Sequence, residues 1–214
     1  MRLVKKMKGE ELDMKNRLVV VSNRLPITIN RAGDNWQIKP GAGGLITALA
    51  PLMKTNQGIW VGWPGCGADA PIDDLVESFA KAQGYSLKPV PLTEDEVEKY
   101  YRGFSNEALW PLFHDLLGHC IFSHDNYRVY DAVNRRFAQV TAEASSDKDI
   151  IWIHDYQLIS SGWYLRQLHP RRKIAFFLHI PFPYYEIFRT LPWRRDILQE
   201  SLGTDLIGCQ TDDC

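Results

Sequence analysis

The sequence lacks long apolar runs, a dominant charge and closely spaced cysteines, and each absence excludes a class of protein. No stretch of ~18 consecutive apolar residues offers a membrane span, and the N-terminus lacks the apolar core of a signal peptide. Lysine and arginine number 25 against 26 aspartates and glutamates, a formal net charge of −1, so the overall balance favours neither nucleic acid nor an anionic membrane as a partner. We therefore expect a cytoplasmic protein in which any phosphate chemistry is local.

The cysteines and histidines show no spacing typical of a disulfide framework or a metal site. The four cysteines form no CxxC pair; they are Cys66, Cys120, Cys209 and Cys214. This favours reduced thiols. Three histidines recur every five residues, which does not place them on one helical face, at His114, His119 and His124. We predict no metal site there, and neither a GxSxG elbow nor a Walker loop is present.

Length and composition are those of an ordinary globular domain. The 214 residues are 45% hydrophobic and 24% charged, with 15 glycines and 12 prolines, which excludes disorder, collagen and coiled coil. At ~150 residues per domain, one large domain is favoured over two. Residues 1–16 interleave charges of both signs and predict a solvated extension, so the domain is expected over residues 17–214.

Short apolar runs along the chain predict a parallel sheet. Residues 17–22 contain Leu18–Val21, a largely β-branched run that suits a strand buried on both faces. Similar runs, most of them separated by stretches with helical spacing, recur at 58–62, 150–154, 174–180 and 206–208. This alternation predicts an α/β fold, a Rossmann-like doubly wound and mostly parallel sheet. Residues 27–38, with a Gly/Asp/Asn turn, predict a small β-hairpin inserted after the first strand.

Helices are expected where apolar residues return at helical spacing. One begins at the glycines before Leu45 and extends to Lys54, and another covers residues 126–144. The strand predicted at 206–208 has no helix after it to cover it. Because a doubly wound sheet usually continues after such a strand, we expect the chain to be the first part of a longer protein.

The region between these helices carries its own start signals. Thr93 and Glu96 have the spacing of a capping box. Ser105 is a candidate cap for a second helix that would continue through Leu117, with Pro111 kinking or restarting it.

Polar residues follow the predicted strands at their carboxyl ends, where open parallel sheets bind ligands. Arg24 follows the first strand, Asp155 the third, His179 the fourth and Gln210 the fifth. Each of the first three also has a plain structural interpretation, as a surface arginine, a helix N-cap and a hydrogen-bonded core histidine respectively. The residues alone leave both interpretations open.

Glycines and aromatic residues add to this candidate site. Gly43 and Gly44 open a helix, so unpaired N–H groups and the positive end of the helix dipole would favour a phosphate or diphosphate, although a plain tight turn is equally compatible. With Gly41 they do not form GxGxxG, which disfavours a nicotinamide-dependent enzyme. Tyr101 and Trp110 lie in a polar, capped region and are the aromatics best placed to stack on a sugar.

Several strings, taken in order from about Arg17 to the end of the chain, resemble the N-terminal half of the trehalose-6-phosphate synthase family. They are Ser22–Arg24, Gly43–Leu45, Trp60–Trp63, Tyr100–Tyr101, Phe104–Asn106, Leu109–Pro111, Ile151–Tyr156, Phe176–Pro183 and Gln210–Thr211. Two positions depart from the family, which often has histidine in place of Gln157 and phenylalanine in place of Cys209.

The resemblance implies a retaining glycosyltransferase with the two-Rossmann-domain architecture called GT-B. This chain would be the N-terminal, acceptor-side domain, and the donor-binding C-terminal domain would be absent. The whole enzyme would transfer glucose from UDP-glucose, or another nucleotide-glucose, to glucose 6-phosphate and give trehalose 6-phosphate. No metal and no cofactor is implied, because the cations that neutralise the leaving diphosphate come from the other domain. The chain alone is therefore expected to be inactive, and the resemblance allows a homo-oligomeric full-length enzyme.

The resemblance also implies roles on the acceptor side. Arg24 would bind the acceptor phosphate, for which a guanidinium fork is suited, with Tyr101 beside it. Trp110 would wall the acceptor sugar, and Gln210 would belong to the same site. Asp155 would hold sugar hydroxyls at the reacting centre.

Other roles concern the donor. Gly43 and Gly44 would let backbone amides approach the diphosphate, and His179 would contact the donor glucose. Asp155 and His179 are therefore the expected catalytic residues. In a front-face reaction with retention, the donor phosphate takes the acceptor proton, so the protein contributes mainly positioning and charge stabilisation.

Two other functions remain as alternatives. A sibling transferase such as glucosylglycerol-phosphate synthase would share fold and donor, but Arg24, Tyr101 and Trp110 favour a hexose phosphate, because a three-carbon acceptor needs no aromatic wall. A non-catalytic sugar-phosphate sensor is disfavoured by the presence of Asp155 and His179.

Overall fold

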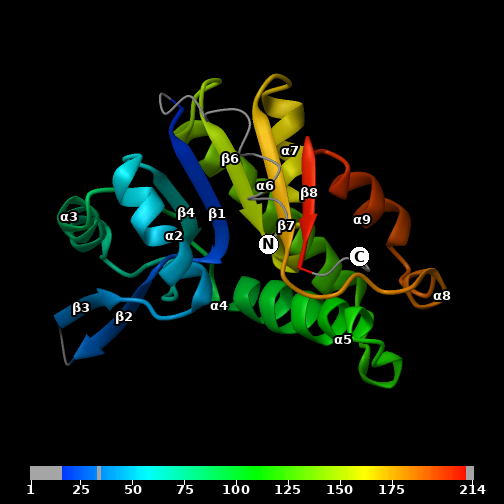
Figure 1. Ribbon diagram of the computed structural model, residues 1–214. Coiled ribbons are helices and arrows are strands. Elements are labelled where there is room, and N and C mark those ends of the chain that lie inside the picture. Colours follow the sequence, from blue (N-terminus) through cyan, green and yellow to red (C-terminus); the bar gives the residue numbers. More distant parts are fainter. Residues whose placement is uncertain (1–15, 33–34, 211–214) are drawn as a thin grey trace.

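The computed structural model describes residues 16–32 and 35–210, and its centre is a six-stranded sheet in the order β5-β4-β1-β6-β7-β8 (Figure 1). Every neighbouring pair of strands is parallel, so all carboxyl ends lie at one edge. The strands are β1 (Leu18–Arg24), β4 (Ile59–Trp63), β5 (Ser86–Pro89), β6 (Ile150–His154), β7 (Lys173–Leu178) and β8 (Leu206–Cys209). The predicted α/β class is confirmed. The predicted extension, residues 1–16, lies outside the described residues except for Asn16.

The strand order reverses between β1 and β6. The chain runs outward from β1 through β4 to β5, then crosses back to β6 and continues outward through β7 to β8. Such a reversal opens a crevice at the carboxyl ends of the two central strands, where doubly wound proteins bind their ligands. Arg24 ends β1 and Asp155 directly follows β6, so both predicted site residues flank this switch point.

Helices cover both faces of the sheet. On one face, α2 (Gly44–Thr55) and α3 (Asp73–Gln83) pack against Val20 and Trp60. On the other, the packed elements are η2 (Val97–Leu109), α6 (His124–Ala144), α7 (Ser161–Leu168) and α9 (Arg194–Ser201). Because successive side chains of a strand point to opposite faces, the run from Val19 to Val21 supplies both cores.

The predicted hairpin is confirmed as β2 (Ile27–Ala32) paired antiparallel with β3 (Asn35–Pro40). It follows β1 after two residues and therefore begins at the carboxyl edge of the sheet, where Figure 1 shows it at the lower left. The predicted turn residues Gly33 and Asp34 lie outside the described residues.

The capping box is confirmed, but the predicted second helix start is wrong. Thr93 Oγ1 accepts from the backbone N–H of Glu96 at 3.2 Å, and the Glu96 carboxylate accepts from the Thr93 N–H at 2.9 Å. From there α4 (Glu94–Glu96), η2 and α5 (Trp110–Phe113) follow one another without a break. Ser105 is buried in the middle of η2 and caps nothing.

The helix passes through Pro111 because its backbone finds other partners. A proline lacks the N–H that would bond the carbonyl four residues earlier, here that of Glu107. The Glu107 carbonyl instead accepts from the N–H of Ile121 at 2.8 Å. The wider turns of η2, a π-helix, shift the bonding pattern just before this point. The predicted helix was to extend through Leu117, but α5 ends at Phe113 and the chain then forms the short η3 (Leu117–His119).

The remaining differences are small. The predicted helix over residues 126–144 begins at His124, with Ser123 Oγ accepting from the N–H of Asn126. Strand β5 was not predicted, because this edge strand has only one buried side chain and contains Pro89. Two short segments, η4 (Tyr156–Leu158) and α8 (Tyr185–Phe188), follow β6 and β7. No helix among the described residues has the length and apolar character to cross a membrane.

Candidate active site

The guanidinium of Arg24 is held against the ring of Trp63, which ends the neighbouring strand. Its Cζ lies 4.6 Å from the ring centroid, a cation–π distance. The Trp63 ring is itself fixed, because its Nε1 donates to the Cys66 carbonyl at 2.9 Å. Arg24 remains exposed, so a charged group rests on a rigid apolar support at the switch point. Trp63 was not singled out from the sequence as a site residue, and its contact with Arg24 was missed.

The loop after β4 closes around the same guanidinium. Gly65 has a φ of +89°, and a Cβ built on it would lie 2.7 Å from Arg24 Cζ. The side chain of Arg24 therefore occupies the space that any residue other than glycine would fill. Burial raises the pKa of the nearby Cys66 thiol, and the charge of Arg24 opposes this effect.

Asp155 connects the loops that follow β6 and β7 through hydrogen bonds. Its Oδ1 accepts from the N–H of Tyr156 at 3.0 Å and from the N–H of His179 at 3.3 Å. Its own N–H donates to the Phe177 carbonyl at 2.8 Å. Asp155 thus serves as the N-cap of η4. Burial raises the pKa of the Asp155 carboxyl, and these hydrogen bonds and His179 oppose the shift.

The backbone of Asp155 is strained, which the sequence did not reveal. Its φ of +76° is rare for a residue with a side chain. Strained residues of this kind cluster at functional sites, where the surrounding structure holds them in place.

His179 is half-buried and bonded to a second imidazole. Its Nε2 lies 3.1 Å from Nδ1 of His154, whose side chain is only 2% exposed. Burial lowers the pKa of His154 to about 3, and burial also lowers the pKa of His179, although the Asp155 carboxylate opposes the latter shift. Both rings are therefore neutral near pH 7. His154 was not singled out from the sequence.

Hydrogen bonds attach η2 to the carboxyl edge. Tyr100 is fully buried, and its hydroxyl donates to Asn23 Oδ1 at 3.0 Å. The Tyr156 hydroxyl donates to Asn106 Oδ1 at 2.9 Å. Tyr101, the predicted contact residue, is half-buried against the core and close enough to Tyr156 to help raise the pKa of its hydroxyl. Two strand ends are thus linked to one helix.

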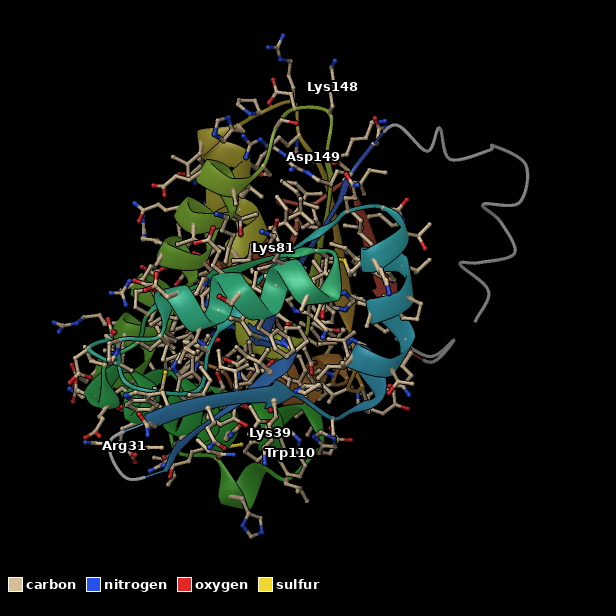
Figure 2. All side chains as sticks on the ribbon, turned by 90° about the vertical axis from the view of Figure 1, so that its left-hand side faces the viewer. Arg31, Lys39, Lys81, Trp110, Lys148 and Asp149 are labelled. Atoms are coloured by element: carbon tan, nitrogen blue, oxygen red, sulfur yellow. The ribbon has the colours of Figure 1, made fainter. Side chains whose placement is uncertain are left out.

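Trp110 lies at the same end of the molecule. Its ring is 40% exposed and stacks on the His114 ring at a centroid distance of 4.2 Å. Figure 2 shows it on the lower side together with Lys39 of the hairpin, opposite Lys148 and Asp149, which precede β6. An exposed tryptophan at the carboxyl edge provides a flat surface on which a sugar could stack.

The N-terminus of α2 is open. Gly43, with a φ of +144°, and Gly44 are exposed, and a Cβ added at either would meet no atom within 4 Å. No side chain caps this helix end. Gly41 packs against the segment that leaves β1, with its N–H donating to the Pro26 carbonyl at 2.9 Å. The amides of Gly43 and Gly44, unlike that of Gly41, are thus free for an anion at the carboxyl edge.

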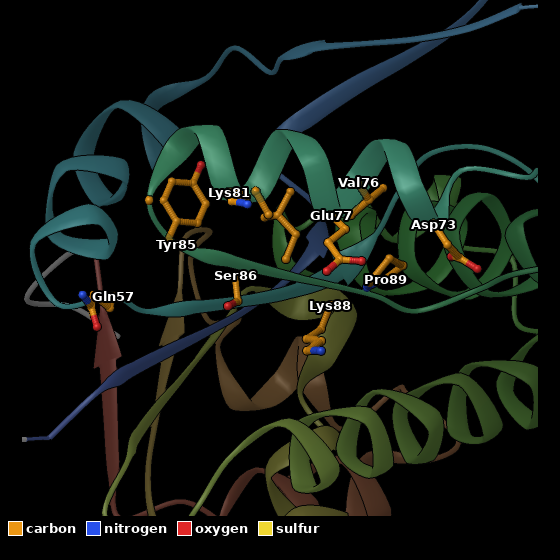
Figure 3. Close-up of a pocket in the computed structure, with 12 residues that line it drawn as sticks. Gln57, Asp73, Val76, Glu77, Lys81, Tyr85, Ser86, Lys88 and Pro89 are labelled. Carbon is orange, nitrogen blue, oxygen red and sulfur yellow. The ribbon is translucent and has the colours of Figure 1, made fainter.

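The predicted residues do not all lie together. Asp155 and His179 are in direct contact, whereas Gln210 follows β8, an edge strand of the sheet, and is exposed. A groove of about 620 Å³ between α3 and β5 contains no predicted site residue (Figure 3). It lies at the opposite edge of the sheet from β8 and is lined in part by Glu77 and Lys88.

Fold and site together define the class: a Rossmann-like α/β domain with a cationic, aromatic and carboxylate-bearing site at the switch point of its sheet. Comparison with known proteins gives the family. The sequence profile of "Glycosyltransferase family 20" matches residues 16–214. The chain belongs to glycosyltransferase family 20.

Named relatives agree with this assignment. Trehalose-6-phosphate synthase of Mycolicibacterium vanbaalenii is 44% identical over 191 residues, which cover 89% of this chain and 39% of that protein. The Escherichia coli enzyme bound with UDP-2-fluoro glucose superposes with a TM-score of 0.76 and 36% identity, covering 92% of this chain and 40% of that one. A UDP-forming synthase of Burkholderia xenovorans in complex with glucose-6-phosphate gives a TM-score of 0.73 and 30% identity, covering 92% and 41%. The chain thus spans about two fifths of the length of these relatives.

Proposed function

We propose that residues 17–214 are the acceptor-side domain of a retaining glycosyltransferase that transfers glucose from UDP-glucose to glucose 6-phosphate and gives trehalose 6-phosphate. The observation that carries this proposal is the exposed Arg24 guanidinium, fixed between Trp63 and Gly65 at the switch point of the sheet. A planar, preorganised guanidinium suits a phosphate group. The names and ligands of the family relatives support the same substrates.

On the acceptor side, the phosphate is bound by Arg24 with Tyr101 near it, and the sugar ring stacks on Trp110. The Asp155 carboxylate accepts hydrogen bonds from sugar hydroxyls with the oxygen lone pairs that Tyr156 and His179 leave free. Gln210 adds a polar contact from the end of β8. An aromatic wall favours a hexose phosphate over a three-carbon phosphate.

On the donor side, the amides of Gly43 and Gly44 approach the diphosphate at the N-terminus of α2, and His179 contacts the glucose. In the reaction, the bond between the anomeric carbon and the diphosphate breaks, and a bond from that carbon to the acceptor hydroxyl oxygen forms on the same face. The proton of this hydroxyl moves to the departing phosphate oxygen. Asp155 and His179 position the reacting groups and do not form a covalent intermediate.

Titration of the 214-residue chain followed by ligand-observed NMR tests the acceptor assignment. Glucose 6-phosphate is compared with glycerol 3-phosphate and glucose, in the parent chain and in Arg24→Ala. Arg171→Ala is the matched control, because Arg171 is exposed and precedes β7 at the other edge of the sheet. We expect only glucose 6-phosphate to bind and only Arg24→Ala to abolish binding. Stronger binding of glycerol 3-phosphate would assign the chain to a sibling transferase, and no binding by any ligand would contradict the assigned acceptor site.

A further inference from the structure

The imidazoles of His154 and His179 share a single hydrogen bond. Their rings lie 5.3 Å apart between centroids and are inclined by 25°, with 3.1 Å between His154 Nδ1 and His179 Nε2. The strand register explains the contact: His154 pairs with Phe177, and His179 lies two residues further, on the same side of the chain. Because one proton lies between the two nitrogens, the tautomer of either ring determines the tautomer of the other.

Two arrangements satisfy this bond when both rings are neutral. In the first, the Nδ1–H of His154 donates to Nε2 of His179, so the proton of His179 is on Nδ1. In the second, the Nε2–H of His179 donates to Nδ1 of His154, so the proton of His154 is on its own Nε2. Each neutral ring carries one N–H and one acceptor nitrogen.

The surroundings of His154 favour the first arrangement. Its Nε2 is buried and has no hydrogen-bond partner. The nearest rings besides His179 are Trp152, at 4.7 Å between centroids, and Phe177, at 6.5 Å. The second arrangement would place an N–H at this buried nitrogen without an acceptor, and orphaned buried N–H groups are rarer than under-satisfied acceptors. The first leaves only a lone pair there.

We propose that His154 is a positioning residue: its Nδ1–H holds His179 as the Nδ1–H tautomer, so the free nitrogen of His179 is a fixed hydrogen-bond donor. His179 can then donate to an oxygen of a ligand but cannot accept from a hydroxyl. If the proposed function is correct, on which this last step rests, that oxygen belongs to the donor glucose. The tautomer itself is a property of the ligand-free chain.

Long-range ¹H–¹⁵N spectra of the chain with ¹⁵N-labelled histidine, recorded near neutral pH, distinguish the tautomers directly. We expect the signals of His179 to show protonated Nδ1 and bare Nε2. His154→Asn keeps an amide N–H close to the position of Nδ1, so the His179 tautomer is expected to persist. His154→Leu removes the donor, and the signals are expected to shift toward the Nε2–H form. The exposed His119 serves as the internal control in all three proteins.

A His179 with protonated Nε2, or a mixture of tautomers, in the parent chain would overturn the proposal, and so would an unchanged tautomer in a folded His154→Leu. If His154→Leu fails to fold, as judged by its amide spectrum, the parent spectrum and His154→Asn still decide. No ligand is involved, so this result is independent of the glucose 6-phosphate titration. A correct tautomer with no sugar-phosphate binding would contradict the proposed function alone.

Discussion

Replacing Gly65 by alanine tests whether the loop after β4 sets the position of the Arg24 guanidinium. Gly65 adopts a φ of +89°, and its new Cβ would lie 2.7 Å from Cζ of Arg24, far inside van der Waals contact. The end of a long side chain can move, so we expect the guanidinium to leave the Trp63 ring rather than the fold to be lost. The chain would keep Arg24 but in the wrong place.

The two costs of this substitution can be estimated separately. A left-handed backbone costs an L-residue ~1–2 kcal/mol, and at ~2–4 °C per kcal/mol for a domain of this size the Tm falls by ~2–8 °C. Charge-assisted hydrogen bonds contribute ~1.5–3 kcal/mol each, so displacement of Arg24 should weaken glucose 6-phosphate binding by ~10- to 100-fold. Only the second cost concerns the site.

Gly84→Ala is the matched control. Gly84 has a φ of +80°, but a Cβ there would lie at an ordinary 3.5 Å from Lys54 Cγ. Thermal unfolding and ligand-observed NMR titration are measured on both variants. We expect similar losses in Tm and a loss of affinity in Gly65→Ala alone. Equal affinities for glucose 6-phosphate in the two variants would refute the reasoning.

Two further predictions concern stability. Arg136 forms an ion pair with Glu96, with 2.6 Å between Arg136 Nη2 and Glu96 Oε1, and this contact lowers the pKa of Glu96 below its usual value of 4.5. The ion pair therefore stabilises the fold above pH 4.5, and this stabilisation is lost as the pH falls through the lowered pKa. Glu96→Gln should therefore lower the Tm at neutral pH, and a difference from the parent that persists at pH 2 would argue against the ion pair as its cause. Tyr100→Phe removes the hydrogen bond to Asn23 and should cost ~1–3 kcal/mol in chemical denaturation, because a half-buried acceptor loses its donor; an unchanged midpoint would contradict this.

The central strands of the sheet could be predicted because a strand buried on both faces is a continuous apolar run in the sequence. Leu18–Val21 and Ile150–His154 are apolar without alternation, and both proved to be central strands. β5 was missed because it lies at the edge, where Lys88 is exposed and Pro89 ends the strand. About half of the side chains in such an edge strand are polar, so its sequence resembles that of a loop.

The helix through Pro111 shows why local signals can fail. A serine before an amphipathic stretch is a good N-cap locally, yet Ser105 lies buried within η2. The helix continues because the Glu107 carbonyl accepts a hydrogen bond from the N–H of Ile121, which is distant in the sequence. A pattern within one turn cannot reveal a partner supplied by tertiary structure.

The candidate site residues at the strand ends could be predicted from the sequence, but the residues that hold them in place could not. Arg24, Asp155 and His179 are polar residues at the carboxyl ends of apolar runs, so they could be identified from the sequence. Trp63 and His154 are the last residues of β4 and β6, and neither was singled out from the sequence as a site residue. Their contacts with the site depend on the register between neighbouring strands, and no motif within either strand encodes it.

The charges of the site explain why this domain is expected to be inactive alone. In the proposed function Arg24 is engaged by the acceptor phosphate, and His179, whose pKa is lowered by burial, is neutral near pH 7. The N-terminus of α2 then supplies only about half a positive charge to the donor diphosphate. A terminal phosphate alone carries ~1.5–2 negative charges at neutral pH. These groups leave most of the charge on the leaving diphosphate uncompensated, and we expect glucose transfer to require cationic residues of a second domain.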